Sequence, residues 1–208
     1  ELKSPLSAIK GASEILQSPL STDKKQLFAN NIESETVRMQ QLIDKLLTLT
    51  KLEQLPELEQ RKKVFVKPLF EAIKDSFIAR TTTQNVQVVI SCDPSSACLG
   101  DVFLIQQALY NIFDNALDFI NEGGEIHIQV IQEPSYVQIY IDNTGPCIPD
   151  YALERITERF YSLPRANGKK STGLGLNFVD QVVKLHKGQL NIKNTKNGVR
   201  VHINMPTP

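Results

Sequence analysis

Three polar side chains in the segment of residues 101–120 have the types and spacing of a metal site. Asn111, Asn115 and Asp118 occupy positions i, i+4 and i+7, so in a helix they share one face. Amide and carboxylate oxygens are hard ligands, which suit a Mg²⁺ ion that is also bound by substrate phosphates. A solvated polar stripe would show the same spacing, so the pattern alone leaves both alternatives open.

Two further segments have the features of a ligand site. Asn143 continues the apolar alternation of a strand at its end, and Gly145 would let the backbone approach a flat ligand closely. The glycine-rich run 168–176 precedes a helical pattern, and a helix start presents free N–H groups to an anion. Seven bases and one acid lie between residues 161 and 198. An ordinary turn and a flexible capping loop explain each segment about as well when it is taken alone.

Two kinds of structure must position these residues. Before residue 55, apolar residues recur at helical steps in two segments separated by Ser18-Pro19-Leu20-Ser21. The second segment has the spacing of a coiled-coil or bundle seam. Such a hairpin cannot bury its apolar face alone, so we expect a symmetric dimer that forms a four-helix bundle. Packing of the hairpin on its own downstream domain is the alternative.

The rest of the chain alternates between helical and strand patterns. Residues 56–63 form a charged linker in this interpretation. We expect strands at 64–66, 86–91, 126–131, 137–141, 190–194 and 199–204, and helices at 67–80, 101–120 and 174–186. The predicted fold is therefore α+β: a helical hairpin over 1–55, then an α/β sandwich over 64–208 with a mixed sheet and helices on one face.

Composition excludes several classes of protein. The 208 residues carry 23 Lys and Arg against 23 Asp and Glu, and this neutrality argues against a direct nucleic-acid or polybasic membrane binder. No apolar run approaches the roughly 18 residues of a membrane span. Cys92, Cys98 and Cys147 have no metal-ligand spacing and are expected to be reduced thiols.

In this order, the segments resemble the motifs of the sensor histidine kinases of bacterial two-component systems. Residues 111–119 are similar to the N box, 143–149 to the G1 box, 158–161 to the F box and 168–176 to the G2 box. Glu1-Leu2-Lys3-Ser4-Pro5-Leu6 is similar to the H box after its histidine. The stretches 148–153 and 159–168 resemble CreC-type sensor kinases.

The resemblance implies ATP and Mg²⁺ as cofactors and assigns roles to individual residues. Asn115 would bind Mg²⁺, with Asn111 and Asp118 on the same helix face, and Asn143 would meet the adenine amino group beside Gly145. Arg165 and Lys169 would lie on a mobile lid. The remaining expected nucleotide contacts are Arg159, Tyr161, Thr172, Gly173, Leu174, Gly175 and Leu176.

The same resemblance places catalysis at the start of the chain. Glu1 would accept the proton of the phosphoacceptor histidine, and Ser4 has the position that serves dephosphorylation of the regulator. None of the three histidines, His127, His186 and His202, lies in the H box, so we expect this chain as given not to autophosphorylate. The partners implied are a second copy of the chain and a response-regulator receiver domain, and the location implied is the cytoplasmic part of a bacterial inner-membrane sensor.

Four residues depart from the family pattern. Asn143 replaces the usual Asp, Cys147 and Ser171 replace glycines, and Asp118 replaces a frequent basic residue. An amide oxygen can still accept a hydrogen bond from adenine, but without charge assistance. We therefore predict weak Mg-ATP binding. The alternatives are a degenerate ATPase-fold module that only docks a regulator, and a serine-directed kinase of the same ATPase superfamily.

Overall fold

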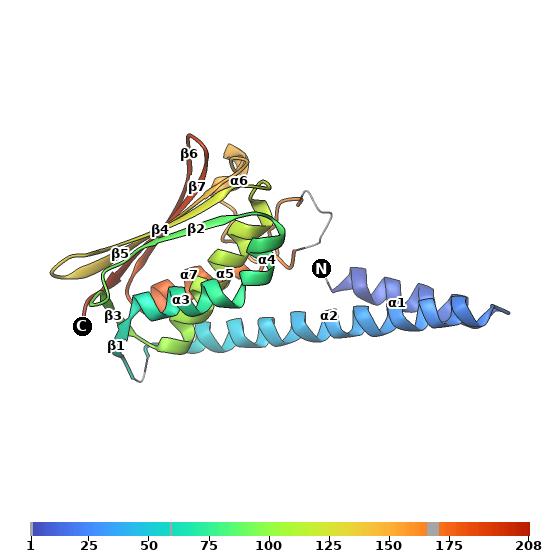
Figure 1. The fold of residues 1–208 in the computed structure, drawn as a ribbon. Coiled ribbons are helices and arrows are strands. Elements are labelled where there is room, and N and C mark those ends of the chain that lie inside the picture. The colour runs from blue at the N-terminus through green and yellow to red at the C-terminus, as the bar shows by residue number, and fades with distance from the viewer. Residues whose placement is uncertain (1, 59, 166–170) are drawn as a thin grey trace. The chain divides into compact units, whose positions relative to one another are not determined.

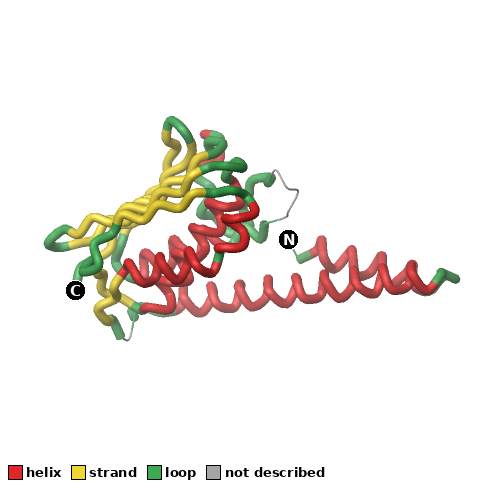
Figure 2. The backbone as a smooth tube through the Cα atoms, viewed as in Figure 1, coloured by secondary structure: helices red, strands yellow, loops and turns green. Residues whose placement is uncertain are grey.

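The computed structural model describes residues 2–58, 60–165 and 171–208 and divides the chain into two compact units. The first unit comprises Glu1–Lys51 and the second Leu52–Pro208. Figure 1 shows the elements in chain order, and Figure 2 separates helices from strands by colour. Within the described residues, no helix combines the length and the apolar character needed to cross a membrane.

A helical hairpin forms the first unit. Helix α1 spans Lys3–Leu16, and helix α2 begins at Thr22 and continues to Gln54, beyond the end of the unit. The break falls where predicted, since Pro19 cannot continue a helix and the Ser18 hydroxyl donates to the Ile15 carbonyl, 2.6 Å away. The chain then reverses, and α1 lies beside the first part of α2 (Figure 1).

A five-stranded sheet dominates the second unit. Its strands are β2 Gln87–Ser91, β4 Glu125–Gln132, β5 Tyr136–Thr144, β6 Gln189–Thr195 and β7 Gly198–Pro206, in the order β2-β4-β5-β7-β6. Strand β2 pairs parallel to β4, and the other pairs are antiparallel. Strands β1 Lys62–Phe65 and β3 Ala97–Gly100 form a separate antiparallel ladder. The sheet is therefore mixed, as predicted.

The helices cover one face of this sheet (Figures 1 and 2). They are α3 Val66–Ser76, α4 Ile78–Thr83, α5 Val102–Phe119 and α7 Gly175–Leu185; a short helix, α6, spans Asp150–Leu153. Along β5, Val137, Ile139 and Ile141 are buried while the residues between them are partly exposed. The strand buries its apolar residues against the helices, which confirms the predicted sandwich.

The structure differs from the predicted elements at three places, one of which is the unpredicted short helix α6. The single helix expected over residues 67–80 is two helices, α3 and α4, separated at Phe77. The Phe77 backbone leaves helical geometry, and its buried ring packs 5.2 Å from that of Phe113. Strand β3 was not predicted, because its four residues form a strand only by pairing with β1.

A buried histidine ties helix α7 to the start of α5. The imidazole of His186 accepts a hydrogen bond at Nε2 from the Asp101 backbone N–H, 3.0 Å away, and its Nδ1 lies 2.7 Å from the Val182 carbonyl. Asp101 in turn caps α5, since its carboxylate accepts from the Leu104 N–H at 2.9 Å. Burial lowers the pKa of His186, so the neutral imidazole required by these bonds is favoured.

Candidate functional site

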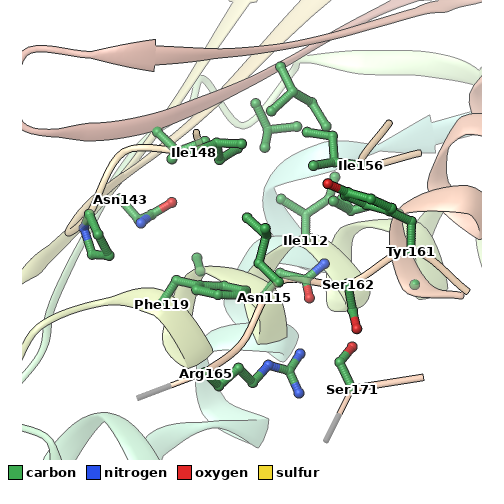
Figure 3. A pocket seen from close by; sticks show the side chains of 18 of the residues that line it. Ile112, Asn115, Phe119, Asn143, Ile148, Ile156, Tyr161, Ser162, Arg165 and Ser171 are labelled. Carbon is green, nitrogen blue, oxygen red and sulfur yellow. The ribbon is translucent and has the colours of Figure 1, made fainter. Parts of the chain in front are cut away.

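The largest set of predicted site residues lies around one cavity of about 360 Å³ in the second unit. Its walls come from α5, the end of β5, the segments 146–149 and 161–165, and the start of α7. Figure 3 shows the side chains that surround it. A cavity of this volume is within the range of small-molecule sites.

One end of the cavity is apolar except for Asn143. Ile141, two residues before Asn143 on β5, is fully buried, and Ile148 lies beside Asn143 in Figure 3. The Asn143 side chain is buried, and its Nδ2 donates to the Thr144 carbonyl at 3.2 Å. With its N–H₂ group directed to this carbonyl, the side-chain oxygen is available as an acceptor. An apolar slot with one acceptor suits a flat base that carries an amino group.

Asp142, the neighbour of Asn143, lies on the other face of the sheet. Its two carboxylate oxygens accept from Arg200 Nε and Nη2 at 2.7 and 2.6 Å. Successive side chains in a strand point to opposite faces, and the register of β5 therefore places Asn143 in the cavity and Asp142 outside it. The choice of Asn143 over Asp142 agrees with this placement.

The other end of the cavity is formed by polar residues of α5 and the start of α7. Asn115 lines it, and Gly175 faces the Asn pair, since a β-carbon at Gly175 would lie 3.5 Å from Asn111 Oδ1 and 3.8 Å from Asn115 Nδ2. Asn111 itself donates through Nδ2 to the Gln107 carbonyl at 2.9 Å. Gly175 begins helix α7, so free backbone N–H groups lie at this end. This chemistry suits phosphate groups.

Two glycines allow the chain to turn closely around the cavity. Gly145 has φ +144°, and a β-carbon there would lie 2.5 Å from the Phe119 carbonyl oxygen. Gly173 has φ +65°, and a β-carbon there would lie 2.4 Å from the carbonyl carbon of Phe160. The Phe160 N–H donates to the Gly173 carbonyl at 2.9 Å. The close approach at Gly145 is thus to the end of α5, whereas the sequence pattern predicted an approach to a ligand.

The segment 161–165 closes one side of the cavity and contributes two of the predicted residues. Tyr161 lines the wall, and the guanidinium of Arg155 lies over its ring at 4.5 Å. Arg165 also lines the wall, but its charge is already paired: Nη2 lies 2.5 Å from Asp118 Oδ2. Asp118 is 5% exposed and also pairs with Arg80 of α4. Asp118 is thus bound to two arginines and lies outside the cavity lining.

The predicted residues are therefore placed in three groups. Those in the cavity wall are Asn115, Asn143, Tyr161, Arg165, Gly173, Gly175 and Leu176. Those outside the lining are Asn111, Asp118, Gly145, Arg159, Thr172 and Leu174, and Arg159 is paired with Glu53 of α2. Ser4 lies in the first turn of α1. Glu1 and Lys169 lie outside the described residues.

The apolar part of the wall was missed by sequence reasoning. Phe119, Ile156, Ile192 and Val201 all line the cavity. Ile192 and Val201 occupy the apolar positions of their alternating strands, which marks them as buried but gives no sign that they border a ligand site. Both residues that replace family glycines, Cys147 and Ser171, also line the cavity.

The donor set fits a Mg²⁺ ion only in combination with phosphate oxygens. In the part of the chain that the structure describes, no group of three or more His, Cys, Asp or Glu side chains could hold a metal. Asn115 offers one neutral amide oxygen. Mg²⁺ commonly takes one or two protein ligands and completes its octahedron with water and substrate phosphate. Asn115 can therefore supply the one protein ligand that such a site needs.

Comparison with known proteins identifies both parts of the chain. Residues 100–208 match the family described as "Histidine kinase-, DNA gyrase B-, and HSP90-like ATPase", and residues 1–55 match the "His Kinase A (phospho-acceptor) domain". Sensor protein CreC of Escherichia coli K12 is 39% identical over 198 residues, which cover 95% of this chain and 41% of CreC. The chain belongs to the sensor histidine kinase family.

Other histidine kinases share this arrangement. The adaptive-response sensory kinase SasA of Crocosphaera subtropica is 30% identical over a region that covers 91% of this chain and 52% of the SasA chain. The solved structure of the Acinetobacter baumannii histidine kinase AdeS has a TM-score of 0.76 at 19% identity, covering 99% of this chain and 96% of AdeS. The histidine kinase ThkA, solved in complex with the response regulator protein TrrA, has the same TM-score and identity and covers 100% of this chain and 59% of its own.

These comparisons confirm the predicted family, the CreC-type resemblance and the fold. The two solved structures share the hairpin followed by a mixed sheet with helices, and at 19% identity they show the fold alone. The chain spans about half the length of the curated histidine kinases it matches, 41% of CreC and 52% of SasA. It corresponds to the histidine kinase core of a two-component sensor.

Proposed function

We propose that the cavity binds Mg-ATP and that the chain transfers the γ-phosphoryl group to a histidine placed immediately before Glu1. The observation that carries this proposal is the division of the cavity into an apolar end with the buried acceptor Asn143 and a polar end with Asn115 and Gly175. The first end suits adenine and the second suits a polyphosphate. Mg²⁺, bound by Asn115 and the phosphates, would neutralise negative charge during transfer.

The groups of the chain have separate tasks in this reaction. The Asn143 oxygen accepts from the adenine amino group, and the backbone N–H groups at the start of α7 hold the phosphates. An imidazole nitrogen attacks the γ-phosphorus, the bond to the bridging oxygen breaks, and ADP leaves. Glu1 accepts the imidazole proton. The phosphoryl group then passes from the histidine to an aspartate of a response regulator.

The partners and the location of the protein are part of the same proposal. The hairpin forms a four-helix bundle with a second copy, and this bundle docks a response-regulator receiver domain. ThkA has been solved with its regulator, and its fold matches the whole of this chain. Ser4, in the first turn of α1, would orient a water for dephosphorylation of the regulator. The parent protein would be an inner-membrane sensor with this core in the cytoplasm.

A chain that carries a histidine directly before Glu1 tests the proposal. With γ-labelled ATP and Mg²⁺ it should gain acid-labile phosphate, and the chain as given should gain none. Asn115→Ala in the histidine-bearing chain should abolish labelling, whereas Asn191→Ala, on an exposed position of β6, should leave it unchanged. No acid-labile phosphate on the folded, histidine-bearing chain would contradict kinase activity.

A degenerate module that docks a regulator without kinase activity is the second candidate. The observation in its favour is that Cys147 and Ser171, which replace family glycines, both line the cavity. Their side chains reduce the space for phosphate and base. The labelling experiment separates the two candidates, because the module would fold and dimerise yet transfer no phosphate.

A further inference from the structure

A cluster of four charged side chains borders the polar end of the cavity. Arg80 of α4 lies 2.6 Å from Asp114 of α5 through Nη1 and pairs with Asp118 through Nη2. Asp118 uses its second oxygen, Oδ2, for Arg165 Nη2 at 2.5 Å. We call these residues the arginine–aspartate cluster. It joins two helices to the segment that closes the cavity, and its two cations and two anions sum to zero charge.

Burial makes Asp118 the centre of this cluster. The Asp118 side chain is 5% exposed and that of Arg165 is 11% exposed, whereas Asp114 is 42% exposed. A carboxylate with so little water around it must be neutralised by partners, and two guanidinium groups do so here. Both of its oxygens are therefore paired, and Asp118 lies outside the cavity lining, so it is not placed to bind a metal ion or a phosphate-bound water there.

Arg165 is the member of the cluster that lines the cavity. Its guanidinium carbon lies 5.6 Å from the centre of the Phe119 ring, which also forms part of the wall. In Figure 3 the guanidinium lies at the same end as Asn115 and Ser171, away from Asn143. Among the described residues, the buried Arg165 Nε has no hydrogen-bond acceptor. A buried donor without a partner is uncommon in proteins, and it shows that the hydrogen-bonding capacity of this guanidinium is not used up by Asp118.

We propose that Asp118, oriented by Arg80, is a positioning residue that holds the Arg165 guanidinium at the polar end of the cavity to bind the nucleotide polyphosphate. This inference rests on the proposed function and revises the expected role of Asp118: the carboxylate serves the nucleotide through Arg165 and does not bind the metal. Arginine has several rotatable bonds, and its ordering costs entropy when a ligand binds. A buried carboxylate that fixes the guanidinium in advance removes most of that cost.

A direct electrostatic effect would have the opposite sign. If Asp118 acted only by its negative charge, its removal would leave the cluster with net positive charge and Mg-ATP would bind more tightly. If it positions Arg165, its removal frees the guanidinium and Mg-ATP binds more weakly. Asp118 and Arg165 are almost fully buried and in contact. We therefore expect the affinity lost when the guanidinium is no longer held to exceed the affinity gained from the more positive cluster.

A double-mutant cycle on the full chain tests the proposal by calorimetric titration with Mg-ATP and with adenosine. We expect Asp118→Asn and Arg165→Gln each to weaken Mg-ATP binding about tenfold, with the double variant no weaker than Arg165→Gln alone. Adenosine, which lacks phosphates, should bind all variants equally. Asp180→Asn, which breaks an ion pair within α7, is the matched control and should change neither affinity.

Arg80→Gln provides a second variant for the case in which Asp118→Asn does not fold. Arg80 does not line the cavity, and of its two carboxylate partners only Asp118 contacts Arg165, so we expect its effect on Mg-ATP to pass through Asp118. We expect weaker Mg-ATP binding, by less than tenfold, unchanged adenosine binding, and no further loss when Arg80→Gln is added to Arg165→Gln.

Several results would overturn the proposal. Tighter or unchanged Mg-ATP binding by a folded Asp118→Asn chain would do so, as would an additional loss in the Arg165→Gln background, which would indicate a direct contact. An equal loss of adenosine binding would show a merely structural role. If the unaltered chain binds no Mg-ATP, the proposed function fails together with this inference. If the chain binds Mg-ATP but the effects of Asp118→Asn and Arg165→Gln simply add, only this inference is contradicted.

Discussion

The two units differ in how far their apolar side chains are buried. In the hairpin, Leu6, Leu27, Val37 and Leu47 are each more than half exposed. In the second unit, strands β4, β5 and β7 and helices α5 and α7 bury most of theirs, although Val102 and Phe103 at the start of α5 are more than half exposed. An exposed apolar face is stable in water only when a partner covers it. The second unit has a core of its own, whereas the apolar residues of the hairpin would be covered by the proposed four-helix bundle with a second copy.

The largest effect should follow from charges placed on the exposed apolar face of the hairpin. Ile43 and Leu47 are 37% and 53% exposed on α2, and burial of such side chains contributes about 2 kcal/mol each. Ile43→Asp with Leu47→Asp should convert the dimer to a monomer and leave nucleotide binding intact. Light scattering after size-exclusion chromatography measures this, with Gln41→Asp and Thr48→Asp, two exposed polar positions of the same helix, as the control pair. A dimer that persists would contradict the four-helix bundle.

A backbone change in the second unit should come next in size. Gly145→Ala would place a β-carbon 2.5 Å from the Phe119 carbonyl oxygen at φ +144°, and strain of this kind costs about 1–3 kcal/mol before the clash is added. Urea denaturation should show lower stability. Gly11→Ala, in α1 with no atom within 4 Å, is the control and should be neutral or slightly stabilising. Equal stability of Gly145→Ala and the unaltered chain would refute this packing.

The prediction of structure from sequence succeeded where the pattern is periodic. The hairpin, the long helix α5 and the alternating strands follow from spacing alone, and the alternation of β5 correctly directed Asn143 to the cavity. Strand β3 and the break at Phe77 depend on tertiary partners that no local pattern reveals. The contact between Asp118 and Arg165 joins residues far apart in sequence, so the helix-face spacing grouped Asp118 with the Asn pair but could not reveal its actual partner.

The buried histidine makes the stability of the second unit depend on pH. Burial lowers the pKa of His186 below its usual 6.5, so the unfolded chain binds a proton before the folded chain does. Stability should thus be complete above pH 6.5 and fall as the pH drops through the region below it, by at most about 1.4 kcal/mol per pH unit. His186→Gln should flatten this dependence in denaturation experiments at several pH values. The pKa of His202 is lowered too, so His202→Gln serves as the comparison, and an equally steep profile in His186→Gln would contradict the role of His186.

The smallest effect is expected at the base-binding end. Asn143→Asp would give adenine a charged acceptor, which strengthens the hydrogen bond, but it would also place a carboxylate oxygen against the Thr144 carbonyl that Asn143 Nδ2 now contacts at 3.2 Å. These effects oppose each other, so Mg-ATP affinity should rise by less than about fivefold. Calorimetry with ATP and adenosine measures it. A loss of more than tenfold for both ligands would show that the bond to Thr144 dominates.

Direct titration of the folded chain with Mg-ATP tests the central claim, that the cavity between α5, β5 and α7 is a nucleotide site. Calorimetry should show saturable binding at millimolar concentrations or below. Asn115→Ala should weaken Mg-ATP binding at least about tenfold while adenosine binding persists. A folded chain that produces no heat with millimolar Mg-ATP, or an Asn115→Ala chain that binds Mg-ATP as well as the unaltered one, would contradict the assignment of this cavity.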